Sequence, residues 1–296
     1  MTASAHESDR ARVWAGRVYV RGRVAGPTMA RKGTLSRETI IQSMAEDFRE
    51  LPYVHAFWEG GAAAFNRVDK WSDLDLYVVV DDGMVPETFE VVEKSLTALS
   101  PIQIRHEVAW PAGSGISQRF YRLERATEFL LIDLAVLKAS APDKFLVPQI
   151  HGDAVFLFNK QNAISIPSFD AEAFIRGLLD RRKRLVERMA LFGPFVEKEI
   201  LRGNHLEALE FYRALVLPSL VEALRMRHGP RHYDFRMRYV HRELRPDLVR
   251  RLERLAFVAD TKDLEAKYRD AVAWFRTAIQ EVDEKEVRRL VSGPSK

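Results

Sequence analysis

Three aspartates interrupt apolar segments in which an ionised side chain is costly to bury. Asp73 and Asp75 are separated by one residue at the start of the apolar run 74–80, and Asp133 is the one charged residue of 129–137. Because side chains alternate along a β-strand, Asp73 and Asp75 are expected on the same face, where a divalent cation would relieve the repulsion between them. An Asp-x-Asp pair alone is more commonly two solvated acids. With Asp133, the three side chains are candidate catalytic residues and ligands of one or two Mg²⁺ ions.

A glycine pair, Gly60-Gly61, precedes the aspartates and ends a predicted strand over 53–59. Without Cβ atoms, the backbone N–H groups of the pair can approach a phosphate, and the small residues 62–64 can begin a helix whose N-terminus faces the same anion. Most glycine pairs are simply turns. Beside three carboxylates on metal ions, however, a glycine-lined phosphate pocket suits in-line transfer at phosphorus, in which the metal ions bind the attacking and leaving oxygens.

The order and spacing of these residues resemble a known superfamily. Gly60-Gly61, an eleven-residue gap before Asp73, the sequence Ser-Asp-Leu-Asp-Leu at 72–76 and the later strand around Asp133 are similar to the motif of DNA polymerase β-type nucleotidyltransferases. The chain most resembles the small bacterial members that adenylylate aminoglycosides and lincosamides. In that family the second glycine is usually followed by a serine that contacts the nucleotide phosphates. Ala62 stands at this position here, which removes one hydroxyl contact.

The resemblance implies a Mg²⁺-dependent enzyme with ATP as its co-substrate. Asp73 and Asp75 would hold two Mg²⁺ ions with the triphosphate, and Asp133 would complete the metal site or take the proton from the acceptor hydroxyl. That hydroxyl would attack the α-phosphorus of the nucleotide and release pyrophosphate. The implied acceptor is a small hydroxylated molecule, with aminoglycoside and lincosamide antibiotics as examples. The nucleotide contacts implied in this half of the chain are Gly60, Gly61, Ala62 and Ser72.

Further contacts to the triphosphate are expected from the basic C-terminal half. The candidates are Lys183, Arg236, Arg238 and Tyr239, because they lie in segments that are dense in basic residues. The segment 231–241 mixes cations with aromatic side chains, as a nucleotide-stacking or nucleic-acid-binding surface would. Each of these charges alone is more commonly a solvated surface group.

Other functions stay open at this point. The basic half would also suit transfer of AMP to a protein side chain or an RNA end, with binding that weakens steeply with salt. A module that binds a nucleotide or a partner without turnover is compatible with Ala62. A glycosyltransferase with an Asp-x-Asp site accounts less well for the glycine pair and for Asp133. Glu107, beside His106 on a predicted strand, is a candidate general base if it faces the site.

The elements that must position these residues are predicted from hydrophobic periodicity. Ser36 is placed to cap a helix whose apolar residues recur at helical spacing as far as Leu51, and a second helix is expected over 87–99. After Pro167 the pattern changes to long amphipathic helices, with Pro218 as a kink or break. The predicted strands cover 53–59, 74–80, 102–109, 118–124, 129–137 and 154–159.

The expected fold class is α+β, with a change of architecture along the chain. A small mixed-sheet nucleotidyltransferase domain is expected over 36–160 and an all-α helical-bundle domain over 161–296, after a flexible N-terminal extension over 1–35.

Composition limits both the chemistry and the location. The 296 residues include no cysteine, which excludes disulfides, thiol nucleophiles and thiolate metal sites, so any metal must be held by oxygen or histidine. The lack of cysteine and of a membrane-spanning apolar run favours a soluble, cytoplasmic protein. The net charge of +4 is uneven, because residues 33–160 carry 19 acidic and 12 basic side chains and the rest of the chain is basic. The expected partners are an NTP and a small acceptor, without nucleic acid or a membrane, and an oligomer is possible.

Overall fold

The computed structural model describes residues 18–20 and 35–293. The chain divides into two compact units, Met1–Ser168 and Phe169–Lys296. Most of the expected N-terminal extension, residues 1–35, lies outside the described residues. Within it, Val18–Val20 forms a short strand, β1, that pairs with a later strand and so belongs to the sheet.

The first unit is built on a seven-stranded mixed sheet with the order β1-β4-β5-β6-β3-β2-β7. The central pair, β3 and β6, is parallel, and every other neighbouring pair of this sheet is antiparallel. The strands after β1 are β2 (Val54–Glu59), β3 (Leu74–Val80), β4 (Ile102–Val108), β5 (Ile116–Leu123), β6 (Ile132–Lys138) and β7 (Val155–Asn159). The sheet predicted from the sequence is therefore confirmed, with small shifts at the strand ends.

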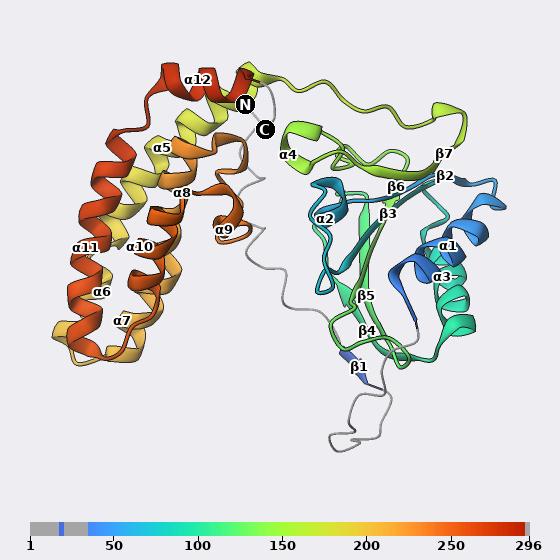
Figure 1. Ribbon diagram of the computed structural model, residues 1–296, viewed down its shortest axis with the longest axis horizontal. Helices are drawn as coiled ribbons and strands as arrows, with labels where there is room; N and C mark the ends of the chain where they lie inside the picture. The colour runs from blue at the N-terminus through green and yellow to red at the C-terminus, as the bar shows by residue number, and fades with distance from the viewer. Residues whose placement is uncertain (1–17, 21–34, 294–296) are drawn as a thin grey trace. The chain divides into compact units, whose positions relative to one another are not determined.

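Two helices, α1 (Arg37–Arg49) and α3 (Val85–Leu99), pack on one face of the sheet (Figure 1). The predicted cap is confirmed, because the Ser36 hydroxyl accepts a hydrogen bond from the Thr39 amide. Alternate residues of β3 point into this layer, where they form a core with apolar residues of both helices. The β3 side chains between them point to the opposite face. The alternate β3 residues of the helix-covered core are Leu74, Leu76, Val78 and Val80.

The opposite face of the sheet carries a smaller apolar cluster and two single-turn helices. Its buried members are Ala56, Trp58, Val79, Ala135, Leu137 and Leu146. The short helices are α2 (Gly61–Ala64) and α4 (Pro148–His151). Because β3 and β6 contribute alternate side chains to this face, it is also the face of the Asp75 and Asp133 side chains.

One strand is shorter than predicted at its start. The prediction placed a strand over 129–137, whereas β6 begins at Ile132. The amides of Leu130 and Leu131 bond to the carbonyls of Thr127 and Phe129, which makes a turn there. Phe129 is half exposed and packs edge-on against Trp71. Local turn bonds and a solvent-facing contact therefore replace the strand pairing expected from the apolar run.

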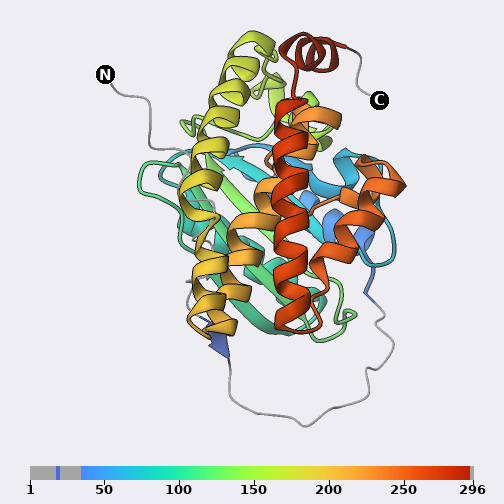
Figure 2. The ribbon, with the colours of Figure 1, turned by 90° about the vertical axis from the view of Figure 1, so that its left-hand side faces the viewer.

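The second unit is entirely helical in the part that the structure describes (Figure 2). Its helices are α5 (Ala171–Phe192), α6 (Phe195–Leu201), α7 (His205–Phe211), α8 (Leu217–His228), α9 (Val240–Glu243), α10 (Pro246–Ala256), α11 (Thr261–Gln280) and α12 (Glu284–Ser292). A π-helical turn, Tyr212–Val216, leads into α8, and Pro218 lies in the first turn of that helix. Phe211, Val216 and Leu217 keep right-handed helical φ and ψ values, so the helix continues through Pro218, with a π turn just before it in place of the expected break.

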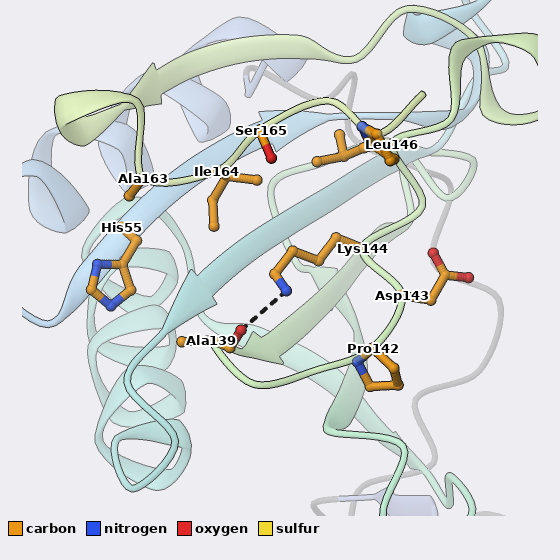
Figure 3. Close-up of a pocket in the computed structure, with 10 residues that line it drawn as sticks. His55, Ala139, Pro142, Asp143, Lys144, Leu146, Ala163, Ile164 and Ser165 are labelled. Atoms are coloured by element: carbon orange, nitrogen blue, oxygen red, sulfur yellow. Dashed lines mark hydrogen bonds between the residues drawn. The ribbon is translucent and has the colours of Figure 1, made fainter. Parts of the chain in front are cut away.

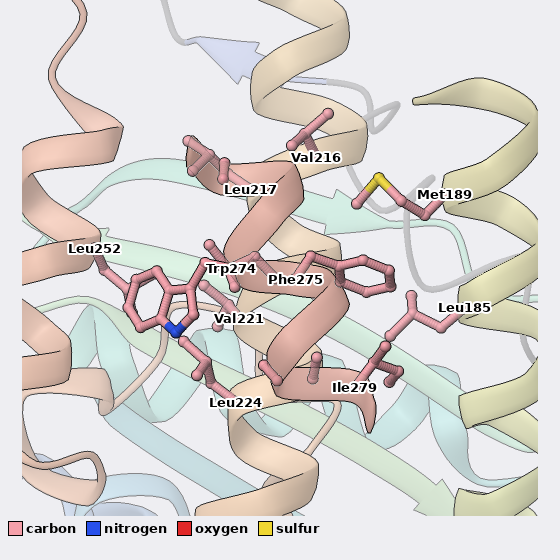
Figure 4. Close-up of a cluster of buried hydrophobic side chains, with 14 of the residues drawn as sticks. Leu185, Met189, Val216, Leu217, Val221, Leu224, Leu252, Trp274, Phe275 and Ile279 are labelled. Atoms are coloured by element: carbon pink, nitrogen blue, oxygen red, sulfur yellow. The ribbon is translucent and has the colours of Figure 1, made fainter. Parts of the chain in front are cut away.

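The core of the helical unit lies around α8 and α11. Figure 4 shows Trp274 of α11 beside Leu252 of α10, and Phe275 beside Leu185 and Met189 of α5. This core contains only side chains of the second unit. A mixed sheet followed by an all-helical unit confirms the α+β fold class. In the part of the chain that the structure describes, none of the helices is sufficiently long and apolar to cross a membrane.

Candidate active site

The three aspartates that the sequence singles out lie at one end of the central parallel strand pair. Asp75 of β3 is directly in register with Asp133 of β6. Asp73 immediately precedes β3, where the amide of Leu74 bonds to the carbonyl of Leu131. Neighbouring residues in register on adjacent strands point to the same face. The backbone therefore brings Asp75 and Asp133 together at the start of both strands, with Asp73 beside them.

The electrostatics of Asp73 reflect this crowding. Burial raises the pKa of the Asp73 carboxyl above its usual range, and the neighbouring Asp75 carboxylate raises this pKa further. A backbone hydrogen bond from Leu131 and the charge of Arg37 act in the opposite direction. Asp73 and Asp75 thus form a like-charge pair whose repulsion a bound cation would relieve.

The glycine pair packs directly against this acidic site. Gly61 has a φ of +50°, and a Cβ atom there would lie 1.7 Å from Oδ2 of Asp75. Gly60 donates its amide to the carbonyl of Asp75 at 2.8 Å, and a Cβ atom on it would lie 2.7 Å from the ring of Tyr77. Only glycine meets both requirements at Gly61, because the left-handed conformation and the close approach exclude a side chain. The pair is therefore part of the carboxylate site.

The helix predicted after the glycine pair is confirmed, but it is a single turn. α2 contains four residues, and its N-cap residue, Gly60, has no side chain that could cap it. A helix of one turn has a weak macrodipole. Any phosphate at this position would depend mainly on individual backbone N–H groups. Ala62 lies in this turn, and its methyl group offers no hydrogen bond.

Ser72 takes part in a turn that leads into β3. Its hydroxyl accepts a bond from the Asp69 amide at 2.9 Å and donates to Oδ1 of Asp69 at 3.1 Å. The same carboxylate accepts from the amide of Trp71. These bonds hold the backbone just before Asp73. The contact between Ser72 and a nucleotide stays a prediction.

Arg37 and Glu59 support the acidic site from the helix-covered side of the sheet. Arg37, at the start of α1, donates to the backbone carbonyls of Ser72 at 2.7 Å and Asp73 at 2.6 Å, and it pairs with the Glu59 carboxylate. Burial raises the pKa of Glu59, the Arg37 guanidinium lowers it, and the charge of Asp75 raises it again. Neither residue stands out in the sequence, because a helix-start arginine and a strand-end glutamate carry no distinctive motif.

Gln118 of β5 contacts the third aspartate. Its Nε2 donates to Oδ1 of Asp133 at 2.5 Å, and its Oε1 accepts from the indole N–H of Trp110 at 3.0 Å. Neither Gln118 nor Trp110 belongs to a motif that the sequence reveals. Glu107, the candidate general base, lies on the other face of the sheet. It is opposite Arg119 of β5, and Arg119 is opposite Leu134 of β6, whose side chain belongs to the helix-covered core. Glu107 therefore faces away from the aspartates, pairs with Arg119, and is not placed to act as their general base.

The donor set is compatible with Mg²⁺, which prefers carboxylate oxygens. Among the described residues, however, no three carboxylate or imidazole groups already form a ligand cluster. One oxygen of Asp133 accepts the bond from Gln118, and Asp75 lies against Gly61. The assignment of Asp73, Asp75 and Asp133 to a metal stays a prediction, which the Asp73–Asp75 repulsion favours.

The other candidate nucleotide contacts all lie in the second unit. Lys183 is on α5, where its side chain is 73% exposed and pairs with Asp180 at 3.3 Å. Arg236, Arg238 and Tyr239 lie between a 3₁₀ turn, Pro230–His232, and α9. Arg236 and Tyr239 adopt left-handed φ values of 53° and 56°. Since the three aspartates belong to the first unit, a joint role in nucleotide binding stays a prediction.

A completely buried arginine holds that C-terminal segment in place. Arg225 of α8 donates to the backbone carbonyls of Arg236 at 2.8 Å, His232 at 3.3 Å and Arg238, and it pairs with Glu243 at 2.6 Å. Glu243 also bonds to Nδ1 of His232 at 3.1 Å. The exposed Arg236 and Arg238 are thus presented by an ordered backbone, a feature that the sequence did not reveal.

A cavity of about 390 Å³ lies at the opposite end of β3 and β6 from the aspartates. Figure 3 shows His55, Lys144 and Ser165 around it, with Lys144 donating to the carbonyl of Ala139. Lys144 also donates to the carbonyl of Ala141 at 2.8 Å, so its ammonium group is engaged by backbone oxygens. None of the candidate catalytic residues lines this cavity.

Comparisons with known proteins include a distant structural likeness. No protein-family model matches the sequence, and no curated protein matches it. The fold is similar to the crystal structure of an aminoglycoside 6-adenyltransferase from Bacillus subtilis, with a TM-score of 0.32 and 14% sequence identity. That alignment covers 84% of this chain and 90% of the other chain. Because the likeness is this distant, a functional assignment has to come from the residues of this chain.

Proposed function

We propose that the protein is a Mg²⁺-dependent nucleotidyltransferase that transfers a nucleoside monophosphate, AMP from ATP, to a hydroxyl group of a small molecule. The observation that carries the proposal is the register of Asp75 opposite Asp133, with Asp73 adjacent and Gly61 packed on the Asp75 carboxylate. Three acids at the start of two parallel strands, beside a backbone without side chains, provide oxygen ligands and room for a phosphate.

In this mechanism the residues mainly bind and orient. Asp73 and Asp75 would hold the cation, and the backbone of Gly60-Gly61 would approach the triphosphate. When bound, Mg²⁺ would neutralise phosphate charge and favour attack at the α-phosphorus. Asp133 would complete the cation site. The acceptor hydroxyl would give up its proton to solvent as the new O–P bond forms and the α–β phosphoanhydride bond breaks, with pyrophosphate as the leaving group. Positioning and electrostatic stabilisation would supply most of the rate enhancement.

The acceptor proposed here is a small hydroxylated molecule, of which aminoglycosides and lincosamides are the first to test. The three aspartates contribute to the acidic character of residues 33–160, so this charge is not independent support for a cationic acceptor.

The first test is calorimetric binding of a non-hydrolysable ATP analogue in the presence and absence of Mg²⁺. We expect the wild-type protein to bind only with Mg²⁺ and Asp73→Asn to lose this binding with its fold intact, because the substitution removes one charge from a repulsive pair. Asp82→Asn is the matched control, since exposed Asp82 lies beyond the other end of β3 and bonds to Ser140. Failure of the wild-type protein to bind any NTP analogue at millimolar concentration would contradict the proposal.

A second candidate function is nucleotide binding without turnover. Ala62 favours it, because the single turn after Gly61 lacks the hydroxyl that the resembling family usually has. Release of pyrophosphate during incubation with ATP and a panel of hydroxylated acceptors separates the two functions. Mg²⁺-dependent binding without release on any small-molecule, protein or RNA acceptor would favour the binding module.

A further inference from the structure

A two-bond relay connects an indole to the third aspartate. The N–H of Trp110 donates to Oε1 of Gln118 at 3.0 Å, and Nε2 of Gln118 donates to Oδ1 of Asp133 at 2.5 Å. Gln118 is in register with Ala135, two residues beyond Asp133 on β6, so its side chain reaches diagonally along one face of the sheet. Trp110 follows the end of β4, the strand on the other side of β5.

The chemistry of the indole fixes the direction of this relay. An indole nitrogen only donates, whereas a glutamine amide has one accepting end and one donating end. The bond from Trp110 therefore requires the amide oxygen to face the indole. The amide nitrogen must then face Asp133, which accepts. An ionised Asp133 only accepts, so the indole N–H and the carboxylate select the same orientation of the Gln118 amide.

Trp110 is itself held in place. Its ring packs on Phe145 at a centroid distance of 6.4 Å, and Phe145 packs on Tyr77 of β3 at 5.9 Å. Trp110, Gln118 and Asp133 are all partly buried. A hydrogen bond to a charged carboxylate is stronger than a neutral one, and partial removal from water strengthens it further.

We propose that Gln118, oriented by Trp110, is a positioning residue for Asp133: its hydrogen bond fixes the orientation in which the Asp133 carboxylate meets the cation shared with Asp73 and Asp75. This inference rests on the function proposed above. A carboxylate fixed in advance loses less side-chain entropy when it binds a cation. Partners behind a metal ligand typically change metal affinity by about 10–100-fold when they are removed.

The test is a double-mutant cycle on Mn²⁺ affinity in the presence of an ATP analogue. The affinity is measured from the electron paramagnetic resonance signal of the free ion. Gln118→Met removes both hydrogen bonds at similar side-chain length, and Trp110→Phe keeps an aromatic ring against Phe145 but removes the N–H donor. We expect Gln118→Met to weaken Mn²⁺ binding by about tenfold, and Trp110→Phe to weaken it by a smaller factor. The double variant should bind no more weakly than Gln118→Met alone, because Trp110 acts only through Gln118.

Controls separate positioning from folding. Trp274→Phe, in the core of the helical unit, is a tryptophan substitution that should leave Mn²⁺ affinity unchanged. The melting temperature of each variant, compared with that of the wild type, shows whether the fold is intact.

Three outcomes would overturn the inference. Unchanged Mn²⁺ affinity in Gln118→Met would exclude positioning, and so would additive losses in the double variant. If the wild-type protein binds Mn²⁺ and Asp75→Asn abolishes this binding, such results reject the relay alone. A wild-type protein that does not bind Mn²⁺ with any nucleotide analogue would instead overturn the proposed function and the relay together.

Discussion

Gly61 contributes to the candidate site through the absence of a side chain. Its α-carbon lies so close to Asp75 that a Cβ atom would overlap the carboxylate, and its φ of +50° belongs to the left-handed region. The two constraints are independent, since one concerns the backbone and the other concerns space. The contact joins the turn after β2 to Asp75, the aspartate of β3. The geometry of Asp75 is therefore coupled to the backbone of the glycine pair.

We expect Gly61→Ala to destabilise the first unit and to displace Asp75. The left-handed conformation alone costs a non-glycine residue about 1–2 kcal/mol, and the overlap with Oδ2 of Asp75 adds to this cost. Urea unfolding should report the lower free energy of unfolding, and Mn²⁺ titration should report weaker binding. Gly83→Ala is the matched control, because a Cβ atom at Gly83 meets no atom within 4 Å. Equal stability of the two variants would show that Gly61 tolerates a side chain.

Arg37 links three elements at the level of secondary structure. It begins α1, pairs with Glu59 at the end of β2, and bonds to the carbonyls of Ser72 and Asp73 before β3. The side chains of Arg37 and Glu59 are only 14% and 11% exposed. A buried ion pair contributes little net stability by itself, but loss of one partner leaves a buried charge unpaired. The pair therefore fixes where α1 meets the start of β3 and, through the backbone, where Asp73 lies.

The residues of the candidate site that can be predicted from sequence are those whose placement depends only on the strand to which they belong. Strand alternation placed Asp73 and Asp75, and the apolar run around Asp133 indicated a neighbouring strand. Arg37 could not be predicted, because its bond to Ser72 spans 35 residues and depends on how α1 packs. The bond from Gln118 to Asp133 depends on the register of β5 with β6, and neither strand reveals that register alone.

Arg225 also makes contacts across a gap in the sequence: it bonds to the backbone of the segment between the Pro230–His232 turn and α9. We expect Arg225→Met to lower the free energy of unfolding of the helical unit by about 3 kcal/mol, because the Glu243 carboxylate loses its ion pair with Arg225 and three carbonyls lose a donor. Loosening of the segment should also expose the peptide bonds after Arg236 and Arg238. The measurement is the rate of tryptic cleavage at these two sites, by mass spectrometry.

Arg227→Met is the control for that experiment. Arg227 lies on the same helix, is 39% exposed and pairs with an equally accessible Glu281. A surface ion pair contributes about 0–1 kcal/mol, so stability and cleavage should change little. Similar cleavage rates in both variants would show that Arg225 does not order the segment.

The two units differ in how they bury their apolar side chains. The first unit buries apolar side chains on both faces of a sheet. The second unit buries them among helices and also buries Arg225 completely. Each core draws its side chains from one unit. Substitutions in the helical unit should therefore act on its own unfolding, and far-UV circular dichroism, which is dominated by helices, is a suitable signal for it.

The pH dependence of the helical unit should contain a contribution from His228, at the end of α8. Burial lowers the pKa of His228 below the usual 6.5, and the charges of Arg227 and Arg245 lower it further, against smaller opposing effects of Glu281 and Asp247. Among the described residues, the buried Nε2 of His228 has no hydrogen-bond partner. Protonation would thus place a charge in a site that neither solvates nor pairs it well.

The sign of the effect follows from proton binding in the two states. Below pH 6.5 the unfolded chain protonates His228 while the folded unit resists protonation, so stability falls as the pH decreases from 6.5 towards the lowered pKa. One proton changes the free energy of unfolding by at most about 1.4 kcal/mol per pH unit, and partial solvent access makes the slope smaller. His228→Phe should therefore lose less stability than the wild type between pH 7 and about pH 5, as measured by urea unfolding followed by circular dichroism. His205→Gln, at an exposed position, should keep the wild-type pH dependence. Parallel pH profiles for wild type and His228→Phe would show that His228 is free to protonate in the folded unit.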